Sequence, residues 1–313
     1  MTTIGQEIPI ATRRRKDKLM LAACLGATTL AVTVLSVLLL SIFVQGASSL
    51  SWSFLTSFAS RKPAQAGILS PLMGSLWVCA ICALVAIPVG IATAIYLEEY
   101  ARRSRLRNFI QLNISNLSGV PSIVYGILAL AAFGRCFGAI SADDPLSLGD
   151  PDGFFYLQLP FGRSVLAGGL TLSLVILPIM IIAAQEALRA VPPSLRQAAL
   201  ALGSTRWQMV WKVTLPSAMP TMMTGAILSM SRAIGEAAPL LVVGGVLLLF
   251  SVPENLMSDF TVLPLQIYNW AGRPQAEFHK IAAAAIIVQL AVLLAFNAVA
   301  IIIRRKLQRP LQS

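Results

Sequence analysis

Long apolar runs separated by short polar and basic stretches dominate the pattern of this 313-residue chain. A helix needs about 20 apolar residues to cross a bilayer, and six of the runs are near that length. The pattern therefore predicts an all-α polytopic membrane protein with six transmembrane helices. We place these helices at residues 19–46, 70–97, 108–133, 164–190, 219–250 and 279–303.

The fifth apolar run is too long for one straight span and contains Gly235 and Pro239, so we expect a break or kink there. Pro88, Pro121 and Pro178 also fall within predicted spans. Each proline removes a backbone donor, which a membrane helix tolerates where neighbours or a water-filled cavity satisfy the freed groups. Such breaks are typical of transporters but also occur as inert kinks.

The composition supports a membrane protein, with 57% hydrophobic and 12% charged residues against about 25% charged in a soluble domain. Seventeen of the 24 lysines and arginines lie on one side of the predicted spans and six on the other, which predicts that both termini are cytoplasmic. The net charge of +11 thus reflects membrane orientation, and we expect no nucleic-acid partner. The first run is longer than the 7–15 residues of a signal-peptide core, so we interpret it as a retained helix.

We expect no metal or cofactor site in this chain. Cys79 and Cys82 form a C-x-x-C inside an apolar run without a nearby histidine, so we interpret them as packing residues. The sequence also lacks a G-x-x-x-x-G-K-[ST] run, and so it has no loop of that kind to bind ATP. An ATP-driven role would require a separate polypeptide to bind ATP and Mg²⁺.

The outer loop at 134–163 carries four aspartates, followed by Phe154, Phe155 and Tyr156. It is either a solvated loop with an apolar lip at the membrane interface or a docking surface for an external partner.

Residues 191–220 lie between the fourth and fifth spans and predict two short helices outside the membrane. Their sequence is VPPSLRQAALALGSTRWQMVWKVTLPSAMP. Pro192 and Pro193 end the preceding helix, and Ser194 can cap a new one. Gly203 suits the left-handed turn that ends this helix.

Apolar residues occur at helical spacing on both short helices. They are Leu195, Ala198, Ala199 and Leu202 on the first helix and Trp207, Val210 and Trp211 on the second, after a capping Thr205. This apolar surface predicts either a docking site for a soluble partner or a helical elbow that rests on the bilayer with its tryptophans at the headgroups.

The same segment resembles the EAA loop of ABC importer permeases, which reads EAA, three residues, Gly, nine residues and Ile-x-Leu-Pro. The spacing matches throughout, and the matching residues are Gln197, Ala198, Ala199, Gly203, Val213, Leu215 and Pro216. The resemblance implies that these residues couple the chain to a groove of a separate ATP-binding subunit. Gln197 replaces the family's glutamate, so that contact is expected to be a neutral hydrogen bond.

Two charged residues, Arg232 and Glu236, lie inside the fifth apolar run. Arg232 follows Pro220 by twelve residues, or about 18 Å of helix, which is near mid-bilayer. A charge there costs about 2.5 kcal/mol or more, so it must face a partner or a cavity. The two residues are four apart and can pair as a structural ion pair. Alternatively they line a substrate pathway, in which the guanidinium binds a tetrahedral oxyanion and the carboxylate accepts the proton that hydrogen phosphate has and sulfate lacks.

The surrounding sequence SRAIGEAAPLL is similar to a motif of the PstA-type phosphate permease family, and GVPSIVYG at 119–126 resembles a second one. The resemblance extends from about Gly67 to the last span. The candidate substrate-pathway residues are Ser231, Arg232, Glu236, Gly119, Pro121 and Ser122. The family fold would be that of a type I ABC importer permease, with an N-terminal helix and a five-helix core.

The resemblance implies a phosphate importer of the inner membrane that works by alternating access. The chain would pair with a PstC-type permease, two copies of an ATPase and a periplasmic phosphate-binding protein, surrounded by membrane lipid. Its expected parts are residues 1–66 with the first helix, a permease domain at 67–303 and a cytoplasmic tail at 304–313. The alternatives are a permease for sulfate or molybdate, an ion-coupled secondary transporter, or a membrane-anchored regulator whose helical elbow binds DNA.

Overall fold

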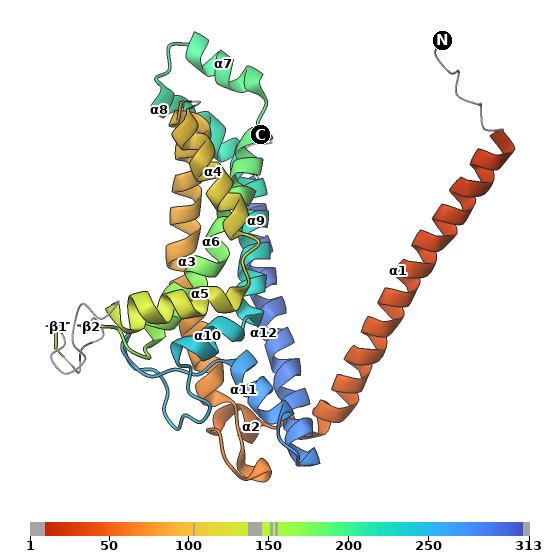
Figure 1. Cartoon of the computed structure of the whole chain (residues 1–313), viewed down its shortest axis with the longest axis vertical. Coiled ribbons are helices and arrows are strands. Elements are labelled where there is room, and N and C mark those ends of the chain that lie inside the picture. Colours follow the sequence, from red (N-terminus) through yellow and green to blue (C-terminus); the bar gives the residue numbers. More distant parts are fainter. Residues whose placement is uncertain (1–9, 103, 137–145, 151–152, 154–155, 309–313) are drawn as a thin grey trace.

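The chain is almost entirely helical in the computed structural model, which describes residues 10–102, 104–136, 146–150, 153 and 156–308 (Figure 1). Thirteen of the 30 residues of the acidic outer loop, Phe154 and Phe155 among them, and the end of the predicted tail lie outside these described residues. The long helices are α1 (Ile10–Gly46), α3 (Leu69–Ile95), α6 (Val165–Arg189), α9 (Leu215–Gly235) and α12 (Ala276–Gln308).

Shorter elements connect the long helices. The helices are α2 (Trp52–Thr56), α4 (Arg105–Leu117), α5 (Ser122–Ala129), α7 (Pro193–Ala201), α8 (Arg206–Met209), α10 (Ala238–Val243) and α11 (Leu263–Ala271). The strands β1 (Leu146–Leu148) and β2 (Leu157–Leu159) pair antiparallel, with Leu146 opposite Leu159. Wider π-helical turns follow α3, α5 and α8 at Tyr96–Tyr100, Leu130–Gly134 and Val210–Thr214.

Four of the described helices, α1, α3, α6 and α12, are long and apolar enough to cross a membrane, and a bent pair of helices makes five if it is counted as one span. In that pair, α4 and the α5 segment meet at 108°, so the expectation of one span over 108–133 is wrong in detail. Pro121 disfavours helical backbone at the preceding residue, which explains the end of α4. The fifth predicted span is divided between α9 and α10, and α9 alone has 21 residues, about 31 Å. The chain is nevertheless a multi-pass helical protein.

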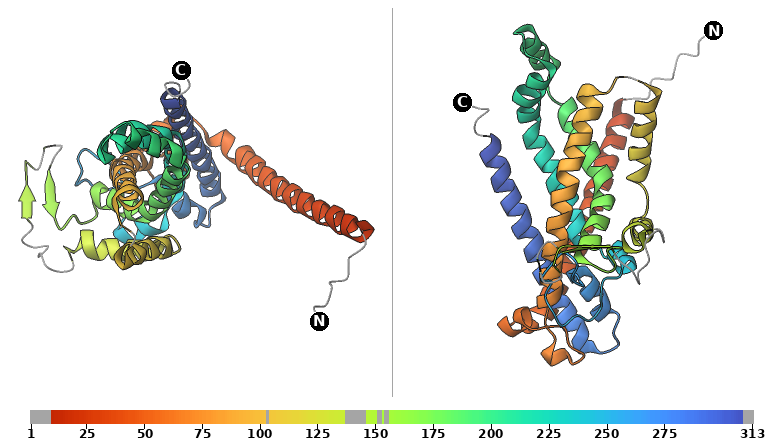
Figure 2. Two further views of the ribbon diagram at one scale, coloured as in Figure 1. Left: turned by 90° about the horizontal axis from the view of Figure 1, so that it is seen from above. Right: turned by 90° about the vertical axis from the view of Figure 1, so that its left-hand side faces the viewer.

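The core of the bundle lies where α3, α6 and α9 pack together (Figure 2). Glycines let α3 and α6 approach closely. A Cβ added at Gly169 of α6 would lie 2.5 Å from Cγ2 of Ile81, and one at Gly90 of α3 would lie 2.7 Å from Cγ of Met180. Cys82 is buried in this core, and Cys79 packs against it. Interiors this close-packed resist changes of a single methyl group.

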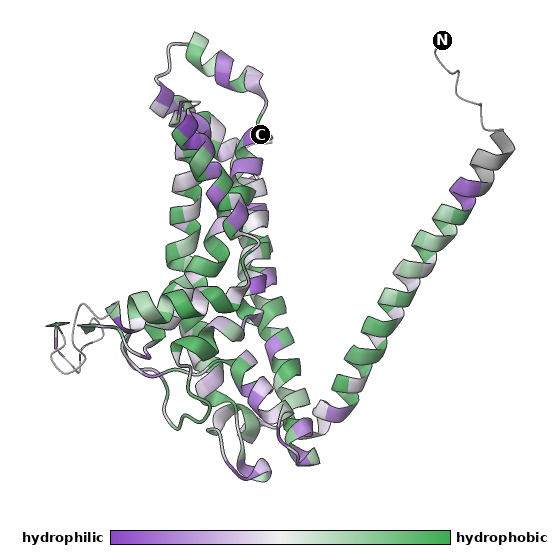
Figure 3. Ribbon diagram, in the orientation of Figure 1, coloured by the Kyte–Doolittle hydropathy of each residue, from purple (hydrophilic) through white to green (hydrophobic). Residues whose placement is uncertain are grey.

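Helix α1 diverges from the bundle, and Figures 1 and 3 show it as a separate apolar rod. None of its most apolar stretch is buried within the chain. Its C-terminal end meets α12, most closely at Gly46, where a Cβ would lie 2.6 Å from the backbone nitrogen of Ala284. Helix α1 begins and α12 ends toward the end of the bundle that carries α7 and α8, whereas α2 and α11 lie at the opposite end (Figure 1).

Candidate functional site

The expected break in the fifth apolar run is present. Helix α9 ends at Gly235, Glu236 has extended backbone (φ −78°, ψ 122°), and α10 begins at Ala238. Pro239 explains this break locally, since it lacks an N–H and its ring would clash with the carbonyl of Gly235 in a continuous helix. Near the end of α9, the Ile234 carbonyl accepts a 3.4 Å hydrogen bond from Nε2 of Gln289 on α12.

Arg232 and Glu236 form the ion pair that their spacing predicts. Nε of Arg232 donates to Oε1 of Glu236 over 3.1 Å. The arginine side chain is 50% exposed and the glutamate 16% exposed, so the pair sits at the edge of the chain with its cation outward. The guanidinium therefore keeps N–H groups free to point away from the chain's own core.

The turn between α4 and α5 contains the other predicted pathway residues. Gly119 and Pro121 are exposed there, and Ser122 is half-buried at the start of α5. Helix α5 packs on α10 so closely that a Cβ on Gly126 would lie 2.8 Å from Cα of Pro239 (Figure 1). The two motif segments thus pack together, through Gly126 and Pro239.

Ser231 lies next to Arg232 in the sequence but binds a different element. Its hydroxyl donates to Oδ1 of Asn297 on α12 over 2.8 Å. It lines a cavity of about 340 Å³ between α9, α11 and α12. A second cavity of about 340 Å³ lies between α3, α9 and α12. Residues around the first include Gly235, Pro264 and Gln289, and those around the second include Cys79 and Phe296. Arg232 lines neither of these cavities, so the predicted pathway residues do not share one enclosed site within this chain.

The exposed irregular backbone has a physical consequence. Gly119, Pro121 and Gly235 are exposed at or beside helix breaks in segments of membrane-spanning length. Backbone groups freed at such breaks cannot face hydrocarbon without losing their hydrogen bonds, so they must face protein or a water-filled cavity. These two breaks are therefore suited to a partner or an aqueous path.

The coupling loop, residues 191–220, forms the two predicted helices α7 and α8 at one end of the bundle (Figure 1). Gly203 has φ +83°, the left-handed conformation expected after α7. Thr205 caps α8 and forms a reciprocal capping box with Gln208. The expectation that Ser194 caps α7 is wrong, because Pro192 precedes α7 and no side chain caps it. A proline at the first helical position leaves one fewer N–H to satisfy.

The predicted apolar stripe of α7 divides between two environments. Ala199 is buried against Met209 and Val210, whereas Leu202 is 88% exposed. Gln197, Ala198, Leu195, Trp207 and Trp211 are also exposed, and the two tryptophan rings lie 5.1 Å apart. Leu215 is buried and Pro216 half-buried where the chain enters α9. Apolar side chains therefore remain available on the outer surface of the loop.

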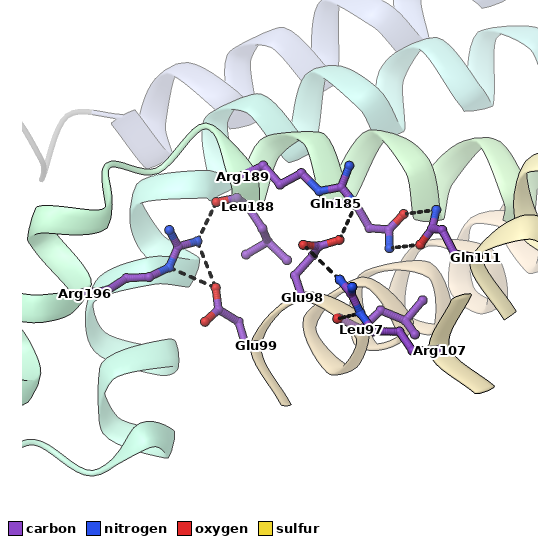
Figure 4. Close-up of polar contacts among 9 residues, drawn as sticks. All are labelled: Leu97, Glu98, Glu99, Arg107, Gln111, Gln185, Leu188, Arg189 and Arg196. Carbon is purple, nitrogen blue, oxygen red and sulfur yellow. Dashed lines mark hydrogen bonds and ion pairs between the residues drawn. The ribbon is translucent and has the colours of Figure 1, made fainter. Parts of the chain in front are cut away.

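Sequence reasoning missed a cluster of charges beneath this loop (Figure 4). We call it the ion-pair cluster, and it consists of Glu98, Glu99, Arg107, Arg189 and Arg196. The available signal was the adjacent pair Glu98-Glu99 at the end of an apolar run, in a chain with only 13 acidic residues. The sequence does not show where their partners lie, since these come from α4, α6 and α7.

The family described as "Binding-protein-dependent transport system inner membrane component" matches residues 86–311, which is most of the chain. The chain belongs to this family. It is a multi-pass membrane subunit of a transport system, and its relatives include permeases of ABC transporters.

Among the permease relatives, "Probable ABC transporter permease protein YqgI" of Bacillus subtilis is 33% identical, over 74% of this chain and 72% of that protein. "Phosphate transport system permease protein PstA 1" of Mycobacterium tuberculosis is 33% identical, over 78% of this chain and 73% of that protein. "Phosphate transport system permease protein PstC" of Pasteurella multocida is 32% identical, over 65% of this chain and 63% of that protein.

Solved structures support the permease fold. A chain of a bacterial alginate ABC transporter, solved in complex with a periplasmic protein, superposes with a TM-score of 0.65 at 17% identity, covering 94% of this chain and 96% of that chain. A chain of the MetNI methionine ABC transporter gives a TM-score of 0.55 at 15% identity, covering 77% and 97%. At these identities the likeness concerns the fold, which is that of an ABC importer permease.

Proposed function

We propose that this chain is the transmembrane permease subunit of an ATP-driven importer of inorganic phosphate and forms half of its translocation pathway by alternating access. The observation that carries the proposal is the outward-facing Arg232, paired with Glu236 beside a helix break. The choice of phosphate over other oxyanions is supported by relatives named as phosphate transport permeases.

Arg232 is the proposed anion contact. Its guanidinium offers a planar fork that fits two oxygens of a tetrahedral anion. Glu236 holds that fork while the pathway is empty and accepts a hydrogen bond from a protonated phosphate oxygen when the anion arrives. Ser231 and the turn at Gly119, Pro121 and Ser122 would complete the surroundings of the pathway.

A homologous PstC-type permease would supply the other half of the pathway. The exposed breaks support this partner, because their backbone needs protein or water rather than lipid. In this arrangement Arg232 faces a cavity shared by the two permeases, surrounded elsewhere by membrane lipid.

The coupling loop would seat in an ATP-binding subunit, with one ATPase copy for each permease. Gln197, Ala198 and Gly203 lie on its exposed surface, and Leu202 offers an apolar contact. ATP and Mg²⁺ belong to those subunits in this proposal. A periplasmic phosphate-binding protein would deliver the anion at the opposite end.

This arrangement makes the α7 end cytoplasmic. Helix α1 begins and α12 ends toward that end (Figure 1). Most of the lysines and arginines outside the predicted spans lie on the same side. Both termini would then be cytoplasmic in the inner membrane.

The test is reconstitution of the chain with its companion subunits in proteoliposomes, followed by uptake of labelled phosphate with and without ATP. Arg232→Ala is expected to lower uptake by about 100-fold, since losing one partner of a desolvated charged contact costs about 2–5 kcal/mol. Arg232→Lys keeps the charge but lacks the planar fork, so its uptake is expected to lie between those of wild type and Arg232→Ala. Arg305→Ala, at the exposed end of α12, is the matched control and should leave uptake unchanged.

Other outcomes would redirect the assignment. Stronger competition by sulfate or molybdate than by phosphate would make the chain a permease for another oxyanion. Uptake driven by an ion gradient without ATP would make it a secondary transporter. Normal uptake by Arg232→Ala would remove this residue from the pathway.

A further inference from the structure

The ion-pair cluster connects four helical segments directly beneath the coupling loop, and the proposed translocation chemistry does not use it (Figure 4). Its two acids lie in the π-helical turn at Tyr96–Tyr100, which continues α3. A π-turn changes the direction of the side chains that follow it and often marks a functional position. Here the two neighbouring carboxylates reach different partners.

Glu99 binds the coupling loop through Arg196 of α7. Its Oε1 accepts from Nε of Arg196 over 3.1 Å and from Nη2 over 2.9 Å. The same guanidinium donates to the carbonyls of Val191 over 2.8 Å and Leu188 over 2.6 Å. One arginine thus joins α7 to the ends of α3 and α6 with four hydrogen bonds.

Glu98 makes the second half of the cluster. Its Oε1 accepts a 2.6 Å hydrogen bond from Nη2 of Arg189, the last residue of α6. Its Oε2 lies 3.6 Å from Nη2 of Arg107 on α4, whose Nε donates to the Leu97 carbonyl over 2.9 Å. One helical turn along from Arg107 on α4, Gln111 exchanges two hydrogen bonds, of 3.1 and 2.7 Å, with the buried Gln185 of α6. The ends of α3, α4 and α6 are therefore fixed to one another.

Burial makes these contacts consequential. The side chains of Glu98 and Glu99 are only 12% and 7% exposed, so loss of a partner would leave a nearly buried carboxylate unpaired. The apolar attachment of α7 is slight by comparison, because Ala199 is its one buried residue. Arg196 is therefore the principal attachment of α7 to the bundle.

We propose that Glu98, Glu99 and Arg196 are positioning residues that hold the coupling loop and the adjoining ends of α3 and α6 together, so that they move as one body. A displacement applied at the loop then reaches both core helices. This inference rests on the proposed function, since it requires an ATP-driven partner at the loop. The inference adds that the ion-pair cluster determines how many phosphate ions are imported per ATP hydrolysed.

The first experiment measures ATP hydrolysed per phosphate imported by the full assembly in proteoliposomes. Arg196→Glu places two carboxylates together, and the ratio is expected to rise by about tenfold, within the range of ordinary coupling free energies. The exchanged pair Glu99→Arg with Arg196→Glu is expected to restore part of the coupling, because it re-forms the ion pair but not the bonds from Arg196 to the Val191 and Leu188 carbonyls. Arg305→Glu makes the same charge change at the exposed end of α12 and should leave the ratio unchanged.

Milder variants keep the test informative if the charge reversal prevents assembly. Glu99→Gln and Arg196→Lys preserve the shape but weaken the forked contact, so each should raise the ratio less than Arg196→Glu. A ratio that stays at the wild-type value in variants that assemble normally would overturn the inference.

The second experiment does not depend on transport. Hydrogen exchange of the α7 amides in the purified chain should become faster in Arg196→Glu and return toward wild type in the exchanged pair. Unchanged exchange would overturn the inference even if the chain imports phosphate. Absence of ATP-driven uptake by the wild-type assembly, with the expected exchange pattern, would instead contradict the proposed function and leave the attachment of the loop in place.

Discussion

Proline has opposite consequences in two parts of this bundle. Helices α3 and α6 contain Pro88 and Pro178 and continue through them as single elements. The runs that contain Pro121 and Pro239 are broken, at the α4–α5 turn and at the end of α9. The residue type is the same, so a proline breaks the helix only in certain surroundings.

The packing of the two regions explains the difference. Helices α3 and α6 pack against each other along much of their length, with close approaches at Gly90 and Gly169. A continuous partner on one side keeps each helix straight across the lost hydrogen bond. Helix α9 packs on α6, whereas α10 beyond the break packs on both α6 and α5, next to Gly126 on α5. Irregular backbone thus forms where the segment after the break gains a new partner, and these are the segments that carry the candidate pathway.

The largest expected effect is on the stability provided by the packing of α3 against α6. Gly169→Ala would place its Cβ 2.5 Å from Cγ2 of Ile81, and overpacking of this kind costs about 1–3 kcal/mol. Gly235→Ala is the matched variant at the break, where nothing lies within 4 Å of an added Cβ. It should be neutral or stabilising by about 0.4–1 kcal/mol, because alanine restricts the unfolded chain.

Thermal unfolding of the purified chain in detergent distinguishes these two glycines. The melting temperature should fall for Gly169→Ala and hold or rise for Gly235→Ala. Equal losses at both positions would contradict the contrast between a tightly packed pair and an open break.

The next effect concerns transport. Pro239→Ala restores an N–H that can bond to the Gly235 carbonyl, so α9 should extend toward α10 and displace Glu236. Uptake should fall on the order of tenfold, since small displacements of a binding group are costly.

Pro88→Ala in α3 provides the comparison for this variant, because α3 is already continuous there. Its uptake should match wild type. Equal loss of uptake in both proline variants would mean that the break at Pro239 has no special role.

The smallest effect is on selectivity. A carboxylate at Glu236 can only accept hydrogen bonds, whereas the amide of Glu236→Gln can also donate to an unprotonated oxyanion. Phosphate-over-sulfate preference should therefore fall by about fivefold, the equivalent of one hydrogen bond of about 1 kcal/mol. Competition assays with labelled phosphate measure this. Glu277→Gln, at the exposed start of α12, should keep the wild-type preference, and an unchanged ratio in both variants would discard the idea.

Local signals in the sequence were sufficient for several elements. Gly235 and Pro239 predicted the end of α9, and Gly203 and Thr205 predicted the turn and cap within the coupling loop. These features depend on one residue's backbone preferences or on neighbours a few positions apart. The ion pair of Arg232 and Glu236 also follows from spacing alone.

Other features depend on partners distant in the chain. The segments on the two sides of Gly119 and Pro121 together have the length and hydropathy of one span, so the composition indicated one span and not a 108° bend. Glu99 and Arg196 are 97 positions apart, and only the packing of α3 against α6 brings them together. The same limit applies to Ser231, whose bond to Asn297 turns it toward α12 rather than toward Arg232.

The isolation of α1 has a consequence for tolerance to sequence change. Its large apolar residues from Leu19 to Val44, except the half-buried Ile42, are exposed and have little contact with the rest of their own chain. Within the chain, these exposed side chains have no specific packing partner, so any apolar residue with a high helix propensity could replace them. Gly46 is different, because the backbone of Ala284 leaves no room for even a methyl group. We therefore expect α1 to tolerate substitutions along most of its length but not at Gly46.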